Sequence, residues 1–210
     1  MSQPGNPERD GTTLRGFLAR ILGWSDEHKV AIEHALRSID LGVTHRAALV
    51  LLGDTTELVS IAEALHRRTL GAECPFVVCD RKRADCESAV AAVQAARGGS
   101  LCMRHAWPPR DFSSMVTMVR DPGASVQFIV CGGVGHADDP FLTLPVPIQV
   151  PPLAAREDEL PRIVDELARD AIATLGAFES DFTDADRGWV VGHGAADVEL
   201  DGAELHAEPR

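Results

Sequence analysis

One stretch in the first quarter of the chain constrains the fold more than any other. The run Ala47–Leu52 is apolar without interruption, and it breaks at Gly53. A helical pattern follows at once, because apolar residues recur at spacings of three and four between Leu58 and Leu65. A strand without polar residues is typical of a parallel sheet whose two faces are both covered by helices. The sequence therefore predicts an α/β fold in which residues 47–52 form a buried strand.

Four further strands alternate with helices along the chain. The strands are expected at 75–79, 100–105, 126–131 and 147–150. The helices are expected at 12–22, 25–39, 57–70, 86–97, 111–121, 157–175 and 182–191, with Ser25 and Thr183 as caps. This alternation predicts a parallel sheet of five strands, joined by right-handed crossovers and flanked by helices.

The pattern divides the chain into five segments. We expect a disordered leader at 1–11, N-terminal helices at 12–46, an α/β domain at 47–153, a helical subdomain at 154–191 and a disordered tail at 192–210.

Charge and composition narrow the function classes. The formal net charge is −12, whereas a broad nucleic-acid-binding face needs a basic stripe. No apolar run approaches the length of a membrane helix, and the polar N-terminus has no signal-peptide core. Five cysteines without a Cys-x-x-Cys pair do not indicate a disulfide framework, and Cys102 and Cys131 are expected to be buried thiols because they lie in predicted strands. We expect a cytoplasmic protein that binds neither nucleic acid nor membranes directly.

The turn after the first strand is the first candidate site. It contains Gly53, Asp54, Thr55 and Thr56 immediately before a predicted helix. A helix N-terminus attracts phosphate through its free N–H groups and its dipole. A working phosphate loop also needs further glycines and a Lys that reaches the phosphates. This turn has one glycine, and neither lysine of the chain lies in it.

Several short motifs occur in order between Ala47 and Leu175. They are Val50-Leu51-Leu52-Gly53-Asp54-Thr55, Ile61-Ala62-Glu63-Ala64-Leu65-His66, Cys74-Pro75-Phe76-Val77, Glu87-Ser88, Ala96-Arg97-Gly98-Gly99-Ser100-Leu101, Val150-Pro151-Pro152-Leu153 and Arg156-Glu157-Asp158-Glu159-Leu160-Pro161. In this order they resemble the AAA+ domain of sigma-54-interacting transcriptional activators, and Phe182–Trp189 is similar to the lid segment that follows in that family. The resemblance implies a P-loop NTPase-like sheet of order 5-1-4-3-2 with a small helical lid after it.

The chain departs from the family where the family's chemistry lies. The Gly-Lys of the phosphate loop is missing, and Arg104 and His105 replace the family's Asp-Glu pair, which holds magnesium and positions water. A cation at Arg104 would repel magnesium. The sequence also lacks the loop that touches the sigma factor, the finger arginines after Cys131 and a helix-turn-helix after Trp189.

The resemblance and these losses together predict a regulator of transcription that acts through protein contacts as a pseudo-ATPase. Its expected partners are sigma-54 RNA polymerase or AAA+ paralogues. No cofactor is expected, and ATP with magnesium would bind if the family activity survives. The alternatives are a functional ATP-binding sigma-54-dependent activator and an unrelated α/β enzyme that uses the crevice at the strand ends.

Two other groups of residues were candidates for chemistry. His105, His136, Asp138 and Asp139 could ligate a metal at one sheet edge, although exposed loop polarity is the plainer interpretation. Ser100 follows a glycine but does not lie in a Gly-x-Ser-x-Gly elbow, which argues against a hydrolase.

Overall fold

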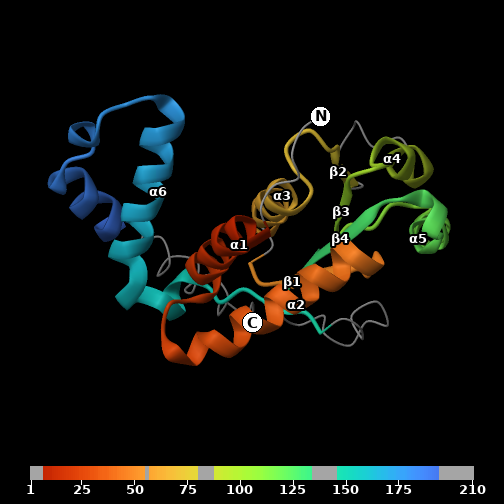
Figure 1. The fold of residues 1–210 in the computed structure, drawn as a ribbon, viewed down its shortest axis with the longest axis horizontal. Helices are drawn as coiled ribbons and strands as arrows, with labels where there is room; N and C mark the ends of the chain where they lie inside the picture. Colours follow the sequence, from red (N-terminus) through yellow and green to blue (C-terminus); the bar gives the residue numbers. More distant parts are fainter. Residues whose placement is uncertain (1–6, 55–56, 80–87, 134–145, 194–210) are drawn as a thin grey trace, which may run out of the picture. The chain divides into compact units, whose positions relative to one another are not determined.

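The computed structural model describes residues 7–54, 57–79, 88–133 and 146–193 (Figure 1). The chain divides into two compact units, Met1–Val150 and Pro151–Arg210. The first, unit 1, contains the sheet and also the helices that precede it. The second, unit 2, begins at the Pro151-Pro152 pair, three residues before the expected start of the helical subdomain at residue 154.

Five parallel strands form one sheet in unit 1. They are β1 (Leu49–Leu52), β2 (Phe76–Cys79), β3 (Ser100–Arg104), β4 (Gln127–Gly132) and β5 (Ile148–Gln149). Their order is β2-β3-β4-β1-β5, and every neighbouring pair is parallel. The five-stranded parallel sheet and its predicted order are therefore confirmed.

Helices cover both faces of this sheet (Figure 1). The helices of one face are α1 (Pro7–Leu22), α2 (Lys29–His45) and α3 (Leu58–Thr69), and those of the other are α4 (Ala89–Ala95) and α5 (Phe112–Arg120). Leu49 and Leu51 pack in the hydrophobic core between the sheet and helices α1–α3, whereas Val50 and Leu52 pack in the core on the side of α4 and α5. The apolar run is thus buried on both faces, because successive side chains of a strand point to opposite sides.

Two helices begin at places that the sequence pattern did not predict. α1 begins at Pro7 rather than Thr12, and proline is favoured in the first turn of a helix. α2 begins at Lys29, and the short 3₁₀ helix η1 (Asp26–His28) precedes it. The predicted cap at Ser25 is wrong, because its hydroxyl bonds to His28 Nδ1 at 2.7 Å instead of to the backbone.

The described part of unit 2 consists of helices and the short segments that join them. Its helices are η4 (Leu153–Glu159), α6 (Leu160–Leu175), η5 (Glu179–Asp181) and a helix over 184–193. Gly176 ends α6 in a left-handed conformation with φ of 65°.

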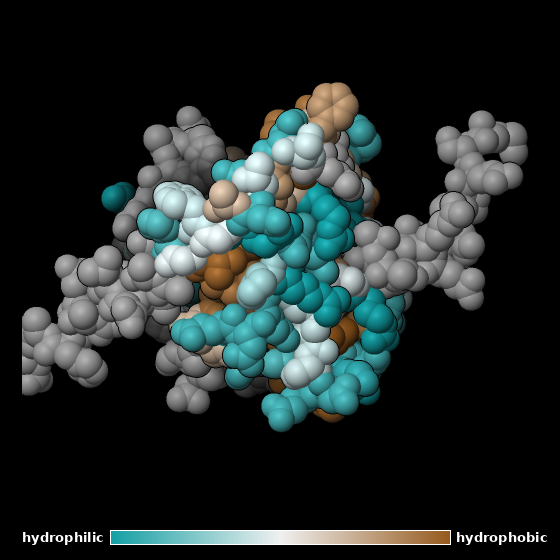
Figure 2. Space-filling view, turned by 90° about the vertical axis from the view of Figure 1, so that its left-hand side faces the viewer, coloured by the Kyte–Doolittle hydropathy of each residue, from teal (hydrophilic) through white to brown (hydrophobic). Residues whose placement is uncertain are grey.

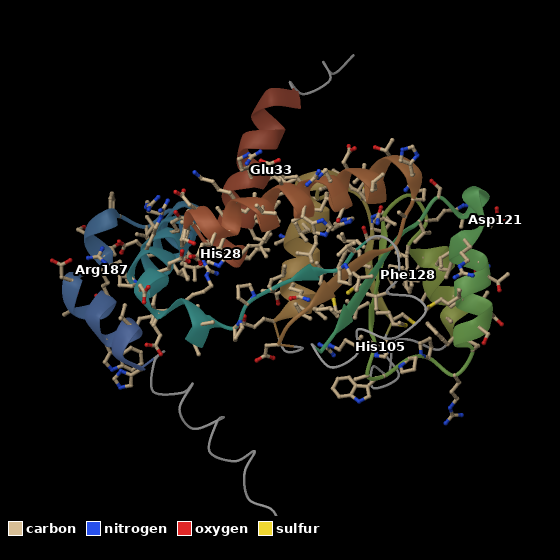
Figure 3. The ribbon with its side chains drawn as sticks, turned by 90° about the horizontal axis from the view of Figure 1, so that it is seen from below. His28, Glu33, His105, Asp121, Phe128 and Arg187 are labelled. Atoms are coloured by element: carbon tan, nitrogen blue, oxygen red, sulfur yellow. The ribbon has the colours of Figure 1, made fainter. Side chains whose placement is uncertain are left out.

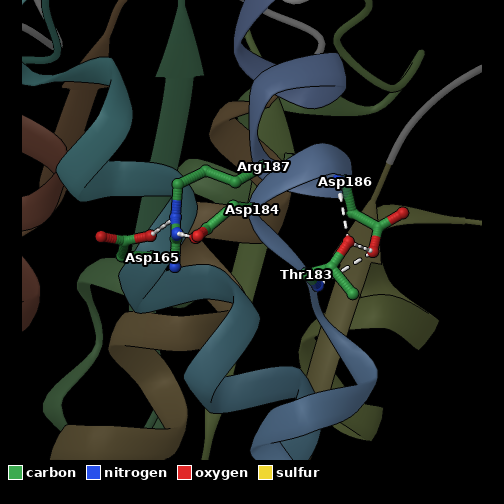
Figure 4. A network of polar contacts seen from close by, with 5 residues as sticks. All are labelled: Asp165, Thr183, Asp184, Asp186 and Arg187. Carbon is green, nitrogen blue, oxygen red and sulfur yellow. Dashed lines mark hydrogen bonds and ion pairs between the residues drawn. The ribbon is translucent and has the colours of Figure 1, made fainter.

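A cap and an ion-pair network fix the last helix. Thr183 caps it as predicted, since the Asp186 N–H donates to Thr183 Oγ1 and the Asp186 carboxylate accepts from the Thr183 N–H. Arg187 pairs with both Asp165 of α6 and Asp184 (Figure 4). These contacts tie the helix over 184–193 to α6.

The surface of the described part is mixed in polarity. Hydrophobic side chains appear in patches between hydrophilic ones (Figure 2). Among the residues that the structure describes, no helix combines the length and the apolar character needed to cross a lipid bilayer.

Candidate functional site

The turn after β1 uses its glycine for packing. The Gly53 N–H donates to the Gly132 carbonyl at 3.1 Å, which continues the contact between β1 and β4. A Cβ at Gly53 would lie only 2.8 Å from the Val150 carbonyl oxygen. A larger residue would therefore push the chain after β5 away from β1, whether or not a ligand ever binds here.

The start of α3 carries negative charge rather than a cation. Asp54 and Glu57 are both exposed, and Glu57 is the residue before the first helical turn. Thr55 and Thr56 lie outside the described residues. A helix N-terminus favours anions, but a phosphate at this turn would meet two carboxylates.

The end of β3 carries the other predicted site residues. Arg104 and His105 are both half-buried. The backbone N–H of His105, a residue labelled in Figure 3, donates to the Cys131 carbonyl at 2.8 Å. The guanidinium carbon of Arg104 lies 5.8 Å from the centre of the Trp107 ring, within cation–π range. The backbone N–H of Trp107 also donates to the Arg104 carbonyl at 3.1 Å. This hydrogen bond closes a tight turn, which holds the Trp107 ring near the Arg104 guanidinium.

β4 brings the two predicted groups to the same edge of the sheet. It lies between β1 and β3, and its last residue is Gly132. A Cβ at Gly132 would lie 3.4 Å from the Leu52 side chain and 3.5 Å from His105 Cβ. Gly53 and His105 therefore flank Gly132 at the carboxyl edge, where parallel α/β sheets bind their ligands.

The end of β3 does not offer the ligands that magnesium needs beside a nucleoside triphosphate. Magnesium needs carboxylate oxygens placed beside phosphates, and β3 ends in a cation and an imidazole. Within the described ranges, no group of three or more His, Cys, Asp or Glu side chains could hold a metal. His136, Asp138 and Asp139 lie outside those ranges, so their predicted grouping with His105 remains a prediction.

A buried Ser–His contact at the opposite end of β3 was missed by the sequence analysis. Ser100 Oγ lies 2.8 Å from His66 Nδ1, and His66 Nε2 lies 3.0 Å from the Cys74 carbonyl. A carbonyl can only accept, so His66 donates a hydrogen bond from Nε2–H to the Cys74 carbonyl. Its Nδ1 accepts a hydrogen bond from the Ser100 hydroxyl. Ser100 and His66 are 0% and 2% exposed, so no substrate reaches them. The pair joins α3 to β3, and a histidine beside the apolar stripe of α3 was the available signal.

The Gly-Gly pair before β3 is also explained by packing. A Cβ at Gly99 would lie 1.9 Å from the Pro75 carbonyl oxygen, which accepts the Ser100 N–H at 2.9 Å. Gly98 has φ of +82°, which favours glycine. The motif therefore allows β2 and the turn after α4 to approach closely.

Comparison with known proteins bears on the fold. No family model matches the sequence, and no curated protein matches it. Among solved structures, NtrX from Brucella abortus matches with 19% identity and a TM-score of 0.50, over 81% of this chain and 47% of that chain. Structures of the same protein in complex with ADP and with ATP match with 18% and 19% identity and TM-scores of 0.49 and 0.48, over 84% and 81% of this chain and 49% and 47% of those chains.

The fold is a P-loop NTPase-like parallel sheet flanked by helices. A five-stranded parallel sheet with helices on both faces is consistent with the NtrX match. At this level of identity the match concerns the fold alone, and the chain spans about half the length of the NtrX structures.

Proposed function

We propose that this protein is a cytoplasmic regulator related to the sigma-54-interacting AAA+ activators, which acts through protein contacts and neither binds nor hydrolyses ATP. The P-loop NTPase-like fold supports the relationship, together with the ordered motifs between Ala47 and Leu175. Sigma-54 RNA polymerase and AAA+ paralogues are the partners that this relationship favours.

The residues at the end of β3 are the main support for the proposed loss of ATPase activity. The position that would hold magnesium beside the phosphates is occupied by Arg104, whose cation lies over the Trp107 ring. Phosphoryl transfer needs a metal that bridges the phosphate oxygens and a group that orients the attacking water. His105 alone leaves the developing charge on the phosphates uncompensated.

The turn after β1 supports the same proposal. Its glycine is explained by contact with Val150, and Asp54 and Glu57 place carboxylates at the start of α3. A missing Lys removes a charge-assisted contact, and such contacts contribute about 1.5–3 kcal/mol each. This loss alone weakens binding by a factor between about 10 and about 150.

Titration calorimetry with ATP and magnesium tests the proposal. We expect no binding heat at concentrations up to about 1 mM and no phosphate release above background. The double variant Arg104→Asp with His105→Glu should also fail, because the turn still lacks a Lys. Addition of Thr56→Lys to this double variant, next to the start of α3, is the gain-of-binding control.

Two results would contradict the proposal. Wild-type binding at about 10 µM ATP would favour the functional activator instead. Steady phosphate release that is abolished by His105→Ala would show that His105 orients water at an active site.

A further inference from the structure

Unit 2 contains an apolar groove between α6 and the segment that follows it. The groove has a volume of about 420 Å³. Its larger apolar lining residues are Val164, Leu167, Ile172, Leu175, Phe182 and Val190. With Ala168 and Ala171, which also line the groove, the α6 residues recur at spacings of three and four and form one stripe along that helix. Asp181 is the charged residue among those that line the groove.

The groove opens to solvent through large side chains. Leu167 is 53% exposed and Leu175 is 79% exposed, although both lie on the apolar stripe of α6. Phe178 and Trp189 do not line the groove, but they add exposed apolar surface to the segment after α6, at 76% and 64% exposure. Apolar surface of this kind, with polar groups around it, marks an interaction site more often than a free surface.

The shape of the groove favours a helix over a small molecule. The stripe from Val164 to Leu175 covers three helical turns, or about 16 Å at 1.5 Å per residue. A small polar ligand needs several convergent polar groups to fix its orientation, and Asp181 is a single such group. A helix that lays an apolar face into a groove needs only anchors spaced along its length.

The net negative charge of unit 2 favours a basic partner. Residues 151–193 contain ten acidic residues and four arginines. Arg187, the arginine of the helix across from α6, is shared by Asp165 and Asp184, and Arg156 pairs with Glu159. A second copy that presents the same acidic unit would be repelled, whereas a basic helix would be attracted.

We propose that this groove docks an amphipathic helix of a partner protein, with apolar residues at i, i+3, i+4 and i+7 and with Lys or Arg on its flanks. The helix lays its apolar side chains along Leu167 and Leu175, and its basic flanks face the acidic surface of unit 2. The inference rests on the proposed function, since it names the kind of protein contact through which that function is exercised. The two proposals fail separately, because ATP titration tests the turn at Gly53 and helix binding tests the groove.

Fluorescence anisotropy with the full-length chain tests the groove. The probe is a labelled synthetic peptide of about 18 residues, built from Leu and Lys, with Leu on one helical face. One control peptide has the same composition in an order that spreads Leu around the helix, and a second has Glu in place of Lys. We expect binding of the first peptide only, and weaker binding at about 300 mM than at about 50 mM salt.

Variants of the chain locate the binding site. Leu167→Gln with Leu175→Gln should weaken binding at least about tenfold, without loss of folding, because both side chains are largely exposed. Val30→Gln is the matched control, since Val30 is 74% exposed on α2 of unit 1. This variant should bind the peptide as the wild type does.

Several outcomes would overturn the proposal. Equal binding of the ordered and reordered peptides would show unspecific charge attraction, and unchanged binding by the double variant would place the peptide elsewhere. A dimer in sedimentation that the double variant dissociates would mean that a second copy fills the groove. Binding that appears only after Val198→Asp with Leu200→Asp would mean that the chain's own end fills it, and no peptide binding by any of these chains would mean that no basic helix docks there.

Discussion

At the scale of single residues, neighbouring glycines between α4 and β3 serve different purposes. Gly99 has no room for a side chain, because an added Cβ would lie 1.9 Å from the Pro75 carbonyl oxygen. Gly98 has open space around an added Cβ, but its φ of +82° strains any other residue. Glycine is thus required at position 99 for lack of space, and at position 98 for its backbone conformation.

This difference predicts unequal costs of substitution. Gly99→Ala should lower the free energy of unfolding by about 3 kcal/mol, because β2 must shift away from β3. Gly98→Ala should cost about 1 kcal/mol, which is the strain of a left-handed alanine. Urea denaturation of both variants measures the two costs. Equal losses would contradict the close approach of Gly99 to Pro75.

At the scale of elements, the pairing of β3 with β4 encloses two thiols. Cys102 Sγ and Cys131 Sγ lie 3.6 Å apart, and both residues are at most 1% exposed. The hydrogen bond with Cys131, and then burial, raise the pKa of the Cys102 thiol well above its ordinary value of 9.0. The buried thiols that the sequence predicted are therefore confirmed for this pair, and a neutral thiol is a poor nucleophile.

The protected pair predicts selective labelling by thiol reagents. Of the cysteines in the described ranges, Cys74 should react first in the native protein at pH 8 because it is half-buried, whereas Cys102 and Cys131 should react only after urea unfolds the chain. Because the folded pKa of Cys102 is raised, its contribution to stability is present below pH 9 and is lost as the pH rises further. Mass spectrometry of labelled peptides measures the order of reaction. Native labelling of Cys102 as fast as that of Cys74 would refute this packing.

The elements also show what the sequence could and could not predict. The run Ala47–Leu52 is apolar at every position, which is typical of a strand covered on both faces. The burial of β1 on both faces could therefore be predicted from these residues alone. The strand order came from the motifs, because no local pattern says which strands are neighbours. Ser25 was misassigned because its hydroxyl has two competing partners, His28 and the backbone, and local propensity does not rank them. The contact of His66 with Ser100 joins residues distant in sequence, and no spacing rule predicts it.

At the scale of the whole molecule, the two units differ in their cores. In unit 1, helices on both faces of the sheet build two cores from many buried apolar side chains. Among the described residues of unit 2, the buried apolar side chains are Leu160, Ile163 and Val164. Burial of apolar area is the main favourable term in folding, so unit 1 should be the more stable unit.

This difference predicts unfolding in two steps. A variant that keeps Trp107 as its single tryptophan should report unit 1, and one that keeps Trp189 should report unit 2, with Phe at the other two positions. We expect the Trp189 signal to change at lower urea concentration than the Trp107 signal. Coincident transitions would instead show one cooperative unit.

The place of β1 in the sheet has a consequence for synthesis of the chain on the ribosome. Leu49 pairs with Ile129, and Leu51 pairs with Ile148, so both partners of β1 are translated long after it. Until then a nascent chain holds an apolar strand with open backbone groups along both of its edges. Such distant pairings slow folding, and the exposed strand can associate with other chains. Productive folding of this protein therefore depends on how well β1 is shielded during translation.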